Sequence, residues 1–177
     1  MYRIDQLLKQ DQKLFHTQDL AILWGTENNN TLYTTIKRYV QKGILIPIHK
    51  GFYSTLPLSN INPFLLGIGY LHSFSYVSTE TVLNNEGILF QKPNYITFIS
   101  NKSKKFKIEN TWYHARKLNE LYLYNESGIQ MLDSVRIATV ERAIADLIYF
   151  DPLYHFDSTE QINWKKVKKI QKEVGYR

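Results

Sequence analysis

The stretch Asn30–Thr55, NTLYTTIKRYVQKGILIPIHKGFYST, decides which fold this sequence predicts. Apolar residues recur at helical spacing in its first half, so we expect a helix over Asn30–Gln41 that ends before Gly43. Its second half is rich in β-branched and aromatic residues and predicts two strands, Ile44–Ile48 and Phe52–Thr55. The short turn between the strands makes them a hairpin.

Two further helices are predicted upstream of this stretch. Ile4 and Leu7 repeat at helical spacing, which indicates a first helix over residues 3–13. Thr17 can cap a second helix, and Gly25 can end it in a left-handed conformation. Three short helices followed by a two-stranded hairpin is the element order of a winged helix-turn-helix. We therefore expect residues 1–57 to form a winged helix-turn-helix DNA-binding domain.

The predicted helix over Asn30–Gln41 has two different faces. Leu32, Ile36 and Tyr39 share an apolar face with Val40, and we expect this face to pack inward. The opposite face presents amides, hydroxyls and cations, which are the groups that read base edges and bind phosphates in the major groove. Tyr33 lies between the faces and fits either the core or a backbone contact. The candidate DNA-binding residues on this helix are Asn30, Thr31, Thr34, Lys37, Arg38 and Gln41.

The predicted hairpin tip carries two further candidates. His49 and Lys50 lie at the turn, from which they can reach flanking phosphates or the minor groove. A polar helix face with two cations is also what an ordinary solvated helix presents. Winged helices bind proteins as well as DNA, so the alternative function is a protein-interaction or adaptor module without a toxin partner.

Residues 58–177 predict a mixed α/β C-terminal domain, which makes the whole chain α+β. Residues 57–62 are expected to be a linker. The aromatic residues on predicted strands are expected to pack in the core rather than to stack on bases: Trp112, Tyr113, Tyr122 and Tyr124. The expected helices are Pro63–His72, Glu80–Asn85, Ala138–Phe150 and Asn163–Val174, and the expected strands are Tyr95–Ile99, Lys107–Arg116, Leu121–Tyr124 and Ile129–Leu132.

The net charge of +6, from 22 Lys and Arg against 16 Asp and Glu, is concentrated in two blocks. Residues 100–117 and 165–177 are strongly basic, whereas residues 118–164 are acidic. The basic blocks provide either auxiliary phosphate contacts, which would steepen the salt dependence of DNA binding, or a solubilising surface. The candidates for auxiliary contacts are Lys102, Lys104, Lys105, Lys165 and Lys168.

Several classes of function find no support in the sequence. There is no cysteine, the five histidines have no metal-ligand spacing, and no glycine-rich phosphate loop occurs. Arg142 and Asp146 are four residues apart and are expected to form a surface ion pair. We expect neither enzymatic activity nor a cofactor nor a metal site. No signal peptide or membrane-spanning run is visible, so we expect a cytoplasmic protein without a membrane partner.

Three segments together resemble one protein family. The first is residues 15–53, with RYVQKGIL at 38–45 before KGFY at 50–53. The second, YVSTETVL at 76–83, precedes Gly87-Ile88, and the third is ATVERAIADL at 138–147. In this order they resemble the AbiEi-type antitoxins of type IV bacterial toxin–antitoxin systems, which are linked to abortive phage infection. The resemblance covers residues 15–152.

This resemblance implies a transcriptional repressor that binds operator repeats in double-stranded DNA at its own promoter. It also implies that the protein counteracts a nucleotidyltransferase-like toxin without forming a stable complex with it. The C-terminal domain, residues 58–177, is implied to carry the antitoxin role. We expect a monomer or a weak dimer.

Overall fold

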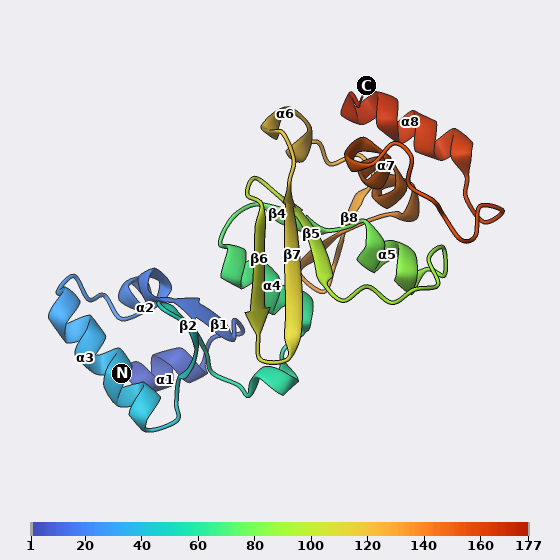
Figure 1. Ribbon diagram of the computed structural model, residues 1–177. Coiled ribbons are helices and arrows are strands. Elements are labelled where there is room, and N and C mark those ends of the chain that lie inside the picture. The colour runs from blue at the N-terminus through green and yellow to red at the C-terminus, as the bar shows by residue number, and fades with distance from the viewer. Residues whose placement is uncertain (1, 177) are drawn as a thin grey trace. The chain divides into compact units, whose positions relative to one another are not determined.

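The computed structural model describes residues 2–176 and divides the chain into two compact units, residues 1–70 and 71–177. Each unit contains helices and one β-sheet (Figure 1), so the α+β class is confirmed. Residues 58–70, which were expected in the second domain, group with the first unit.

The first unit builds its sheet from three short antiparallel strands in the order β1-β3-β2. Its elements in chain order are α1 (Arg3–Leu8), β1 (Leu14–His16), α2 (Thr17–Leu23), α3 (Asn29–Gln41), β2 (Ile46–His49), β3 (Phe52–Ser54), the 3-10 turn η1 (Leu58–Asn60) and α4 (Pro63–Leu71), which continues one residue past the unit boundary. The predicted hairpin and all three predicted N-terminal helices are present. Gly25 and Gly43 both adopt left-handed backbone conformations, with φ of +56° and +68°, as expected for residues that follow helices.

Two local expectations for this unit are wrong, and one strand was not expected. Thr17 is the first residue of α2 and not its cap, because the side chain of His16 occupies the N-cap position and forms a capping box with Asp19. Helix α1 ends at Leu8 instead of near residue 13, because residues 9–13 contain no apolar side chain that would continue its buried face. Strand β1 was not predicted. It exists because Phe15 pairs with Tyr53 of β3, which is a contact between residues far apart in the sequence.

The core of the first unit joins its helices to the sheet. Its buried side chains are Leu7, Phe15, Leu20, Trp24, Leu32, Ile36, Tyr39 and Leu45. The backbone carbonyl of Arg3 accepts a hydrogen bond from the Trp24 indole at 3.1 Å. The Arg3 guanidinium donates to the hydroxyl of Thr26 at 3.0 Å and to that of Thr35 at 2.9 Å. These bonds tie α1 to the loop after α2 and to the inner face of α3.

The second unit is built on a six-stranded mixed sheet in the order β6-β7-β5-β4-β9-β8. The β5–β7 and β4–β9 pairs are parallel, and the other pairs are antiparallel. Helix α7 packs against both α5 and α8. The elements are β4 (Ser75–Val77), α5 (Glu80–Asn85), β5 (Ile96–Ser100), β6 (Lys104–Ile108), β7 (Thr111–Lys117), α6 (Glu120–Leu123), β8 (Ile129–Leu132), β9 (Val135–Ala138), α7 (Val140–Phe150) and α8 (Trp164–Val174).

Two predicted strands of the second unit are wrong. The stretch Lys107–Arg116 is not one strand, because the chain reverses at Glu109, which has a φ of +49°, and β6 and β7 pair as a hairpin. The stretch Leu121–Tyr124 lies mostly in helix α6, because the Asn119 side chain accepts a hydrogen bond from the Leu121 amide at 3.0 Å and caps a helical turn.

The expectation of a surface ion pair between Arg142 and Asp146 is also wrong, because both side chains are fully buried. The Arg142 Nε donates to Asp146 at 2.8 Å. Its other nitrogens donate to the Tyr76 hydroxyl at 2.8 Å and to the backbone carbonyls of Asn125 and Ser127, each at 2.9 Å. The guanidinium is therefore surrounded by acceptors, which offsets the cost of burying its charge.

The Asp146 carboxylate is satisfied in the same way. It accepts hydrogen bonds from the Ser78 hydroxyl at 2.7 Å and from the Tyr176 hydroxyl at 2.5 Å, in addition to that from Arg142. Burial and the Asp146 charge raise the pKa values of Tyr76 and Tyr176, so both phenols remain neutral. We call Tyr76, Ser78, Arg142, Asp146 and Tyr176 the buried polar cluster. It connects β4, α7 and the residues after α8 in the interior of the second unit.

Within the described residues, no helix combines the length and the apolar composition needed to cross a bilayer.

Candidate nucleic-acid interface

The outward face of α3 carries all six candidate residues of that helix. The Asn28 side chain caps the helix by accepting a hydrogen bond from the Thr31 amide at 3.1 Å. Leu32, Ile36 and Tyr39 are buried as expected, and this fixes the orientation of the opposite face. The side chains exposed on that face are Asn30, Thr31, Thr34, Lys37, Arg38 and Gln41.

The charge of α3 suits an anionic partner. The helix contains no acidic residue, and Lys37, Arg38 and the following Lys42 are all exposed cations. Residues 1–70 contain seven Lys and Arg against four Asp and Glu. A phosphate backbone that approached this face would therefore meet cations and neutral hydrogen-bonding groups.

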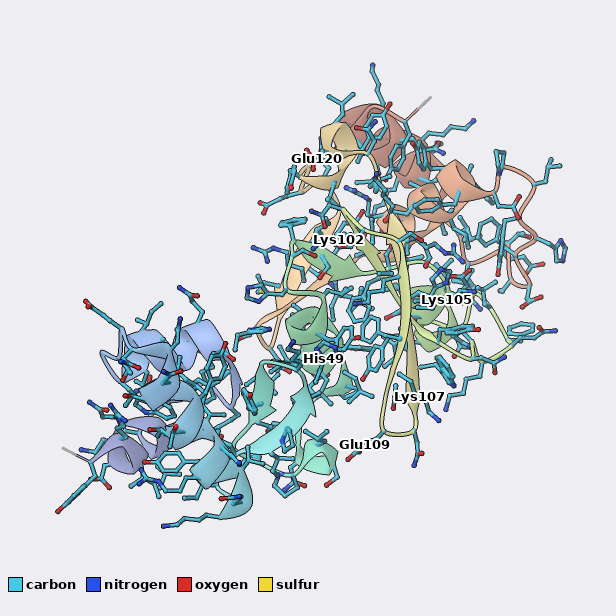
Figure 2. All side chains as sticks on the ribbon, turned by 60° about the vertical axis from the view of Figure 1, so that its left-hand side comes forward. His49, Lys102, Lys105, Lys107, Glu109 and Glu120 are labelled. Atoms are coloured by element: carbon cyan, nitrogen blue, oxygen red, sulfur yellow. The ribbon has the colours of Figure 1, made fainter. Side chains whose placement is uncertain are left out.

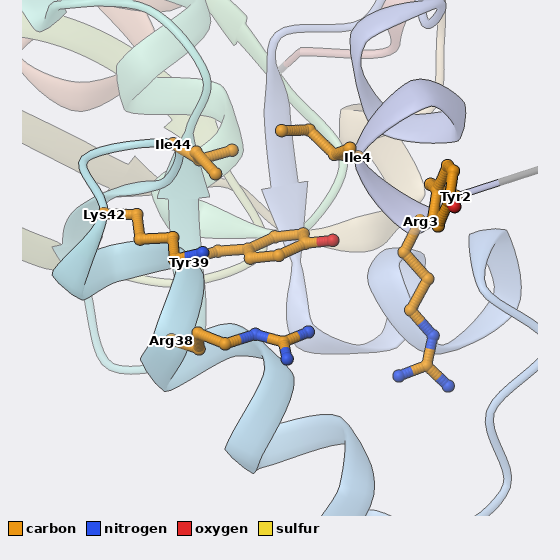
Figure 3. A pocket seen from close by; sticks show the side chains of 7 residues that line it. All are labelled: Tyr2, Arg3, Ile4, Arg38, Tyr39, Lys42 and Ile44. Atoms are coloured by element: carbon orange, nitrogen blue, oxygen red, sulfur yellow. The ribbon is translucent and has the colours of Figure 1, made fainter.

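Arg38 occupies the edge of the α3 face, next to a groove of about 390 Å³. Its guanidinium carbon lies 5.7 Å from the centre of the Tyr39 ring, a cation–π distance. Figure 3 shows Arg38 extending alongside the Tyr39 ring, with Ile4 of α1 and Ile44 lining the same groove. The ring supports the Arg38 side chain while its charge stays exposed, so the side chain is partly ordered before any ligand binds.

The hairpin tip is basic and is held by contacts within the first unit. Gly51 has a φ of +77°, which a two-residue turn requires, and its carbonyl accepts a hydrogen bond from the Thr17 amide at 2.9 Å. His49 and Lys50 are both exposed, and the His49 ring meets the Tyr70 ring edge-on with centroids 4.9 Å apart. Figure 2 labels His49 at the end of β2.

The first group of auxiliary lysines lies on or beside β6 in the second unit (Figure 2). Lys102, Lys104 and Lys105 are all exposed. The Lys105 ammonium lies 5.3 Å from the centre of the Tyr95 ring, and that of the neighbouring Lys107 lies 5.6 Å from the Trp112 ring. Lys105 and Lys107 therefore pack over aromatic rings on the sheet surface.

The second group of auxiliary lysines lies on α8. Lys165 and Lys168 are exposed, and neither takes part in an ion pair within residues 2–176. Lys166 and Lys169, by contrast, approach the carboxylates of Glu141 and Glu173, each at 3.7 Å. The free cations of α8 are thus available to an anionic partner of the second unit.

Two aromatic residues, Trp112 and Tyr124, lie differently from what the sequence indicated, and Tyr33 takes one of the two positions left open for it. Tyr33, which fitted either the core or a surface contact, is 56% exposed beside the α3 face. Trp112 and Tyr124, which were expected in the core, are 46% and 52% exposed. The alternation of side chains along the strand could have indicated the exposed position of Trp112. Tyr113 and Ala115 face the core, so Trp112 lies on the opposite side of the strand. In the described part of the chain, no three His, Asp or Glu side chains lie together as a metal site would need.

The two sheets and their helices define an α+β protein with two units. No family model matches the sequence, and no curated protein matches it. Among solved structures, the chain is similar to the crystal structure of the RV2827C protein from Mycobacterium tuberculosis, with a TM-score of 0.59. The alignment covers 98% of this chain and 73% of that chain at 10% sequence identity. At this identity the similarity concerns the fold alone.

Proposed function

We propose that the first unit is a winged helix-turn-helix DNA-binding domain and that the protein is a transcriptional repressor acting at its own promoter. The observation that carries this proposal is the outward face of α3, on which six hydrogen-bonding or cationic side chains are exposed without any acidic residue. In this proposal α3 enters the major groove, where Thr34 and Arg38 read base edges.

The order of elements in the first unit supports the same proposal. Helices α1, α2 and α3 precede the β2–β3 hairpin, and β1 completes a small sheet with it. In a winged helix, the third helix reads the groove while the hairpin contacts the flanking backbone or minor groove. We assign these flanking contacts to His49 and Lys50.

We further propose an antitoxin role for the second unit, which counteracts a nucleotidyltransferase-like toxin. The support is the resemblance of its two sequence motifs to those of AbiEi-type antitoxins. Tyr76 and Ser78 from the first motif bond to Arg142 and Asp146 from the second motif in the buried polar cluster. These four residues therefore specify the fold, and the contacts with the toxin pathway are left to the exposed surface.

The test is a gel shift with the DNA upstream of the protein's own gene, at about 150 mM salt. We expect specific binding, and we expect Thr34→Ala and Arg38→Ala each to weaken it by about 5- to 150-fold, the loss of about 1–3 kcal/mol for a base contact. Lys105→Ala is the comparison and should weaken binding far less, because Lys105 lies in the second unit and is a candidate for an auxiliary phosphate contact only. Equal losses in all three variants, or no binding above the nonspecific level, would refute α3 as the reading helix.

The antitoxin role needs a separate test. A nucleotidyltransferase-like protein encoded next to this gene is co-expressed with the intact chain, and bacterial growth is measured. We expect growth to be restored without a stable complex between the two proteins. A stable protein partner together with no affinity for DNA would support the adaptor function instead.

A further inference from the structure

We propose that the second unit binds single-stranded nucleic acid on an exposed face of the β6–β7 hairpin. Two cations and three aromatic rings lie together on this face, and we call them the sheet platform: Tyr95, Lys105, Lys107, Trp112 and His114. In this proposal the rings stack on unpaired bases, and the lysines contact the phosphates on either side. The proposal goes beyond operator binding by the first unit and does not depend on it.

The register of the hairpin places four of these side chains on one face of the sheet. Lys105 is paired with His114, and Lys107 is paired with Trp112, in the antiparallel ladder between β6 and β7. Side chains alternate between the two faces of a strand, and those between the platform residues, such as Tyr113, are buried in the core. Figure 2 shows Lys105 and Lys107 along the hairpin. The platform is therefore part of a regular sheet and is formed before a ligand binds, which lowers the entropic cost of binding.

The three rings of the platform form one cluster. The Tyr95 ring, just before β5, meets the Trp112 ring edge-on with centroids 6.4 Å apart and the His114 ring with centroids 5.7 Å apart. Tyr95 and His114 are half-buried, whereas Trp112 is 46% exposed. Tyr95 therefore supports the Trp112 ring from one side and leaves much of its surface to a ligand. An apolar ring of this size that stays exposed beside other rings indicates an interaction surface.

The charge of this region suits a polyanion. Residues 92–117 contain seven Lys and Arg but one acidic residue, Glu109, which lies at the hairpin turn. The ammonium groups of Lys105 and Lys107 lie 5.3 Å and 5.6 Å from the centre of a platform ring. Both lysines are exposed, so the phosphate beside a stacked base would be within reach of a cation. The bases and phosphates of one strand would thus meet rings and cations that already lie side by side.

The His114 ring completes the platform as a neutral aromatic group. Burial and the charges of Arg116 and Lys105 lower its pKa, and the Glu80 carboxylate, which pairs with Arg116, opposes this effect only in part. At neutral pH the ring is therefore uncharged and presents an aromatic surface to a base.

The rings distinguish a single strand from a duplex. The bases of a duplex stack on each other, so a flat surface meets only its phosphates and groove edges, and the exposed Trp112 ring would find no base to stack on. Unpaired bases present π-faces, and their stacking on aromatic side chains tolerates any sequence. RNA-binding domains with a four-stranded sheet use rings on the sheet surface in this way. The combination of rings and cations therefore selects a single-stranded nucleic acid as the partner.

Substitution of Trp112 in the full chain tests the stacking contact. Binding of a fluorescently labelled oligothymidylate of about 12 nucleotides is measured by fluorescence anisotropy at about 50 mM salt. Trp112→Leu keeps an apolar side chain but removes the ring, and it should weaken binding about 5- to 150-fold, the loss expected for one stacked base. Trp112→Phe keeps a ring and should lose less than Trp112→Leu. Trp164→Leu is the matched control, because Trp164 is 40% exposed on α8 outside the platform, and it should leave binding unchanged.

Further measurements separate stacking from charge attraction alone. Stacking of a base on Trp112 should quench part of the tryptophan emission of the wild-type protein, and Trp112→Phe should abolish this quenching. A duplex of the same length, without the operator sequence, should bind Trp112→Leu as tightly as the wild type, since its bases are not free to stack. Lys107→Ala should reduce the slope of log K against log salt by about 0.7, the value for one phosphate of a single strand, and an unchanged slope would overturn the phosphate contact.

Each result supports or overturns the proposal. A loss of single-strand binding in Trp112→Leu but not in Trp164→Leu, with duplex binding unchanged, supports it. Absence of single-strand binding by the wild type at about 50 mM salt overturns it, as do equal losses in the two leucine variants. An equal loss for the duplex also overturns it, because the platform would then contact backbones alone. If Trp112→Leu does not fold, quenching that disappears in Trp112→Phe supports the proposal, and quenching that persists there overturns it.

Discussion

Asp146→Asn tests whether the buried polar cluster holds the second unit together. The substitution keeps the size of the side chain and an oxygen that can accept from Arg142, but it removes the only negative charge in the cluster. The Arg142 cation, which has no exposed surface, then stays buried without a counter-ion. Removal of one partner of a buried pair costs about 3–5 kcal/mol. This is a large share of a typical unfolding free energy of about 5–15 kcal/mol.

The effect is measured by urea unfolding followed by tryptophan fluorescence. With a slope of about 2 kcal/mol per molar urea, the loss lowers the midpoint by about 1.5–2.5 M. Tyr176→Phe removes one hydroxyl that donates to Asp146, and the loss of this bond to a charged group costs about 1.5–3 kcal/mol. It gives a milder variant if Asp146→Asn fails to fold.

Glu173→Gln is the control for this prediction. Its carboxylate lies 3.7 Å from Lys169 in an exposed pair, which is worth about 0–1 kcal/mol. The expected midpoint shift is below about 0.5 M. If Asp146→Asn and Glu173→Gln shift the midpoint equally, the argument from burial is refuted.

Three further predictions concern two glycines with the same backbone φ, the buried Tyr113 and the hairpin tip. Gly87 and Gly128 both have a φ of +73°, but a Cβ at Gly128 would lie 2.8 Å from the Arg142 Cβ, whereas a Cβ at Gly87 meets nothing within 4 Å. Gly128→Ala should therefore lose about 1–3 kcal/mol more stability than Gly87→Ala in urea unfolding, and equal losses would contradict the close contact. Burial raises the pKa of Tyr113 to about 12, whereas the same phenol in the unfolded chain ionises near pH 10. The contribution of buried Tyr113 to the free energy of unfolding is therefore complete below about pH 10 and is lost as the pH rises towards 12. In a pH titration followed by absorbance at about 295 nm, Tyr113 should ionise at a higher pH in the folded than in the unfolded protein. Ionisation at the same pH in both states would contradict its burial. Lys50→Ala should reduce the slope of log K against log salt for operator binding by about 1, and an unchanged slope would exclude a phosphate contact at the hairpin tip.

The elements that the sequence predicted well are those set by local rules. Helix α3 was predicted to within one residue, because its apolar period and the glycine that follows it are both local signals. Strand β1 was missed because three residues acquire strand geometry only by pairing with Tyr53 and its neighbours in β3. Residues 121–124 look like a strand by composition, but the Asn119 cap turns them into a helix.

For the candidate interface, the sequence by itself determined which side chains share the outward face of α3. This follows from the helical period once Leu32, Ile36 and Tyr39 are assigned to the core. For Arg142 and Asp146, the same period established only that the two side chains lie on one helix face. Tertiary structure decided that this face is buried, because Tyr76 and Ser78 from β4 and Tyr176 from beyond α8 converge on it. No local pattern encodes this convergence, since it brings together hydrogen-bonding groups that are distant in the chain and stabilise the charges only in the folded state.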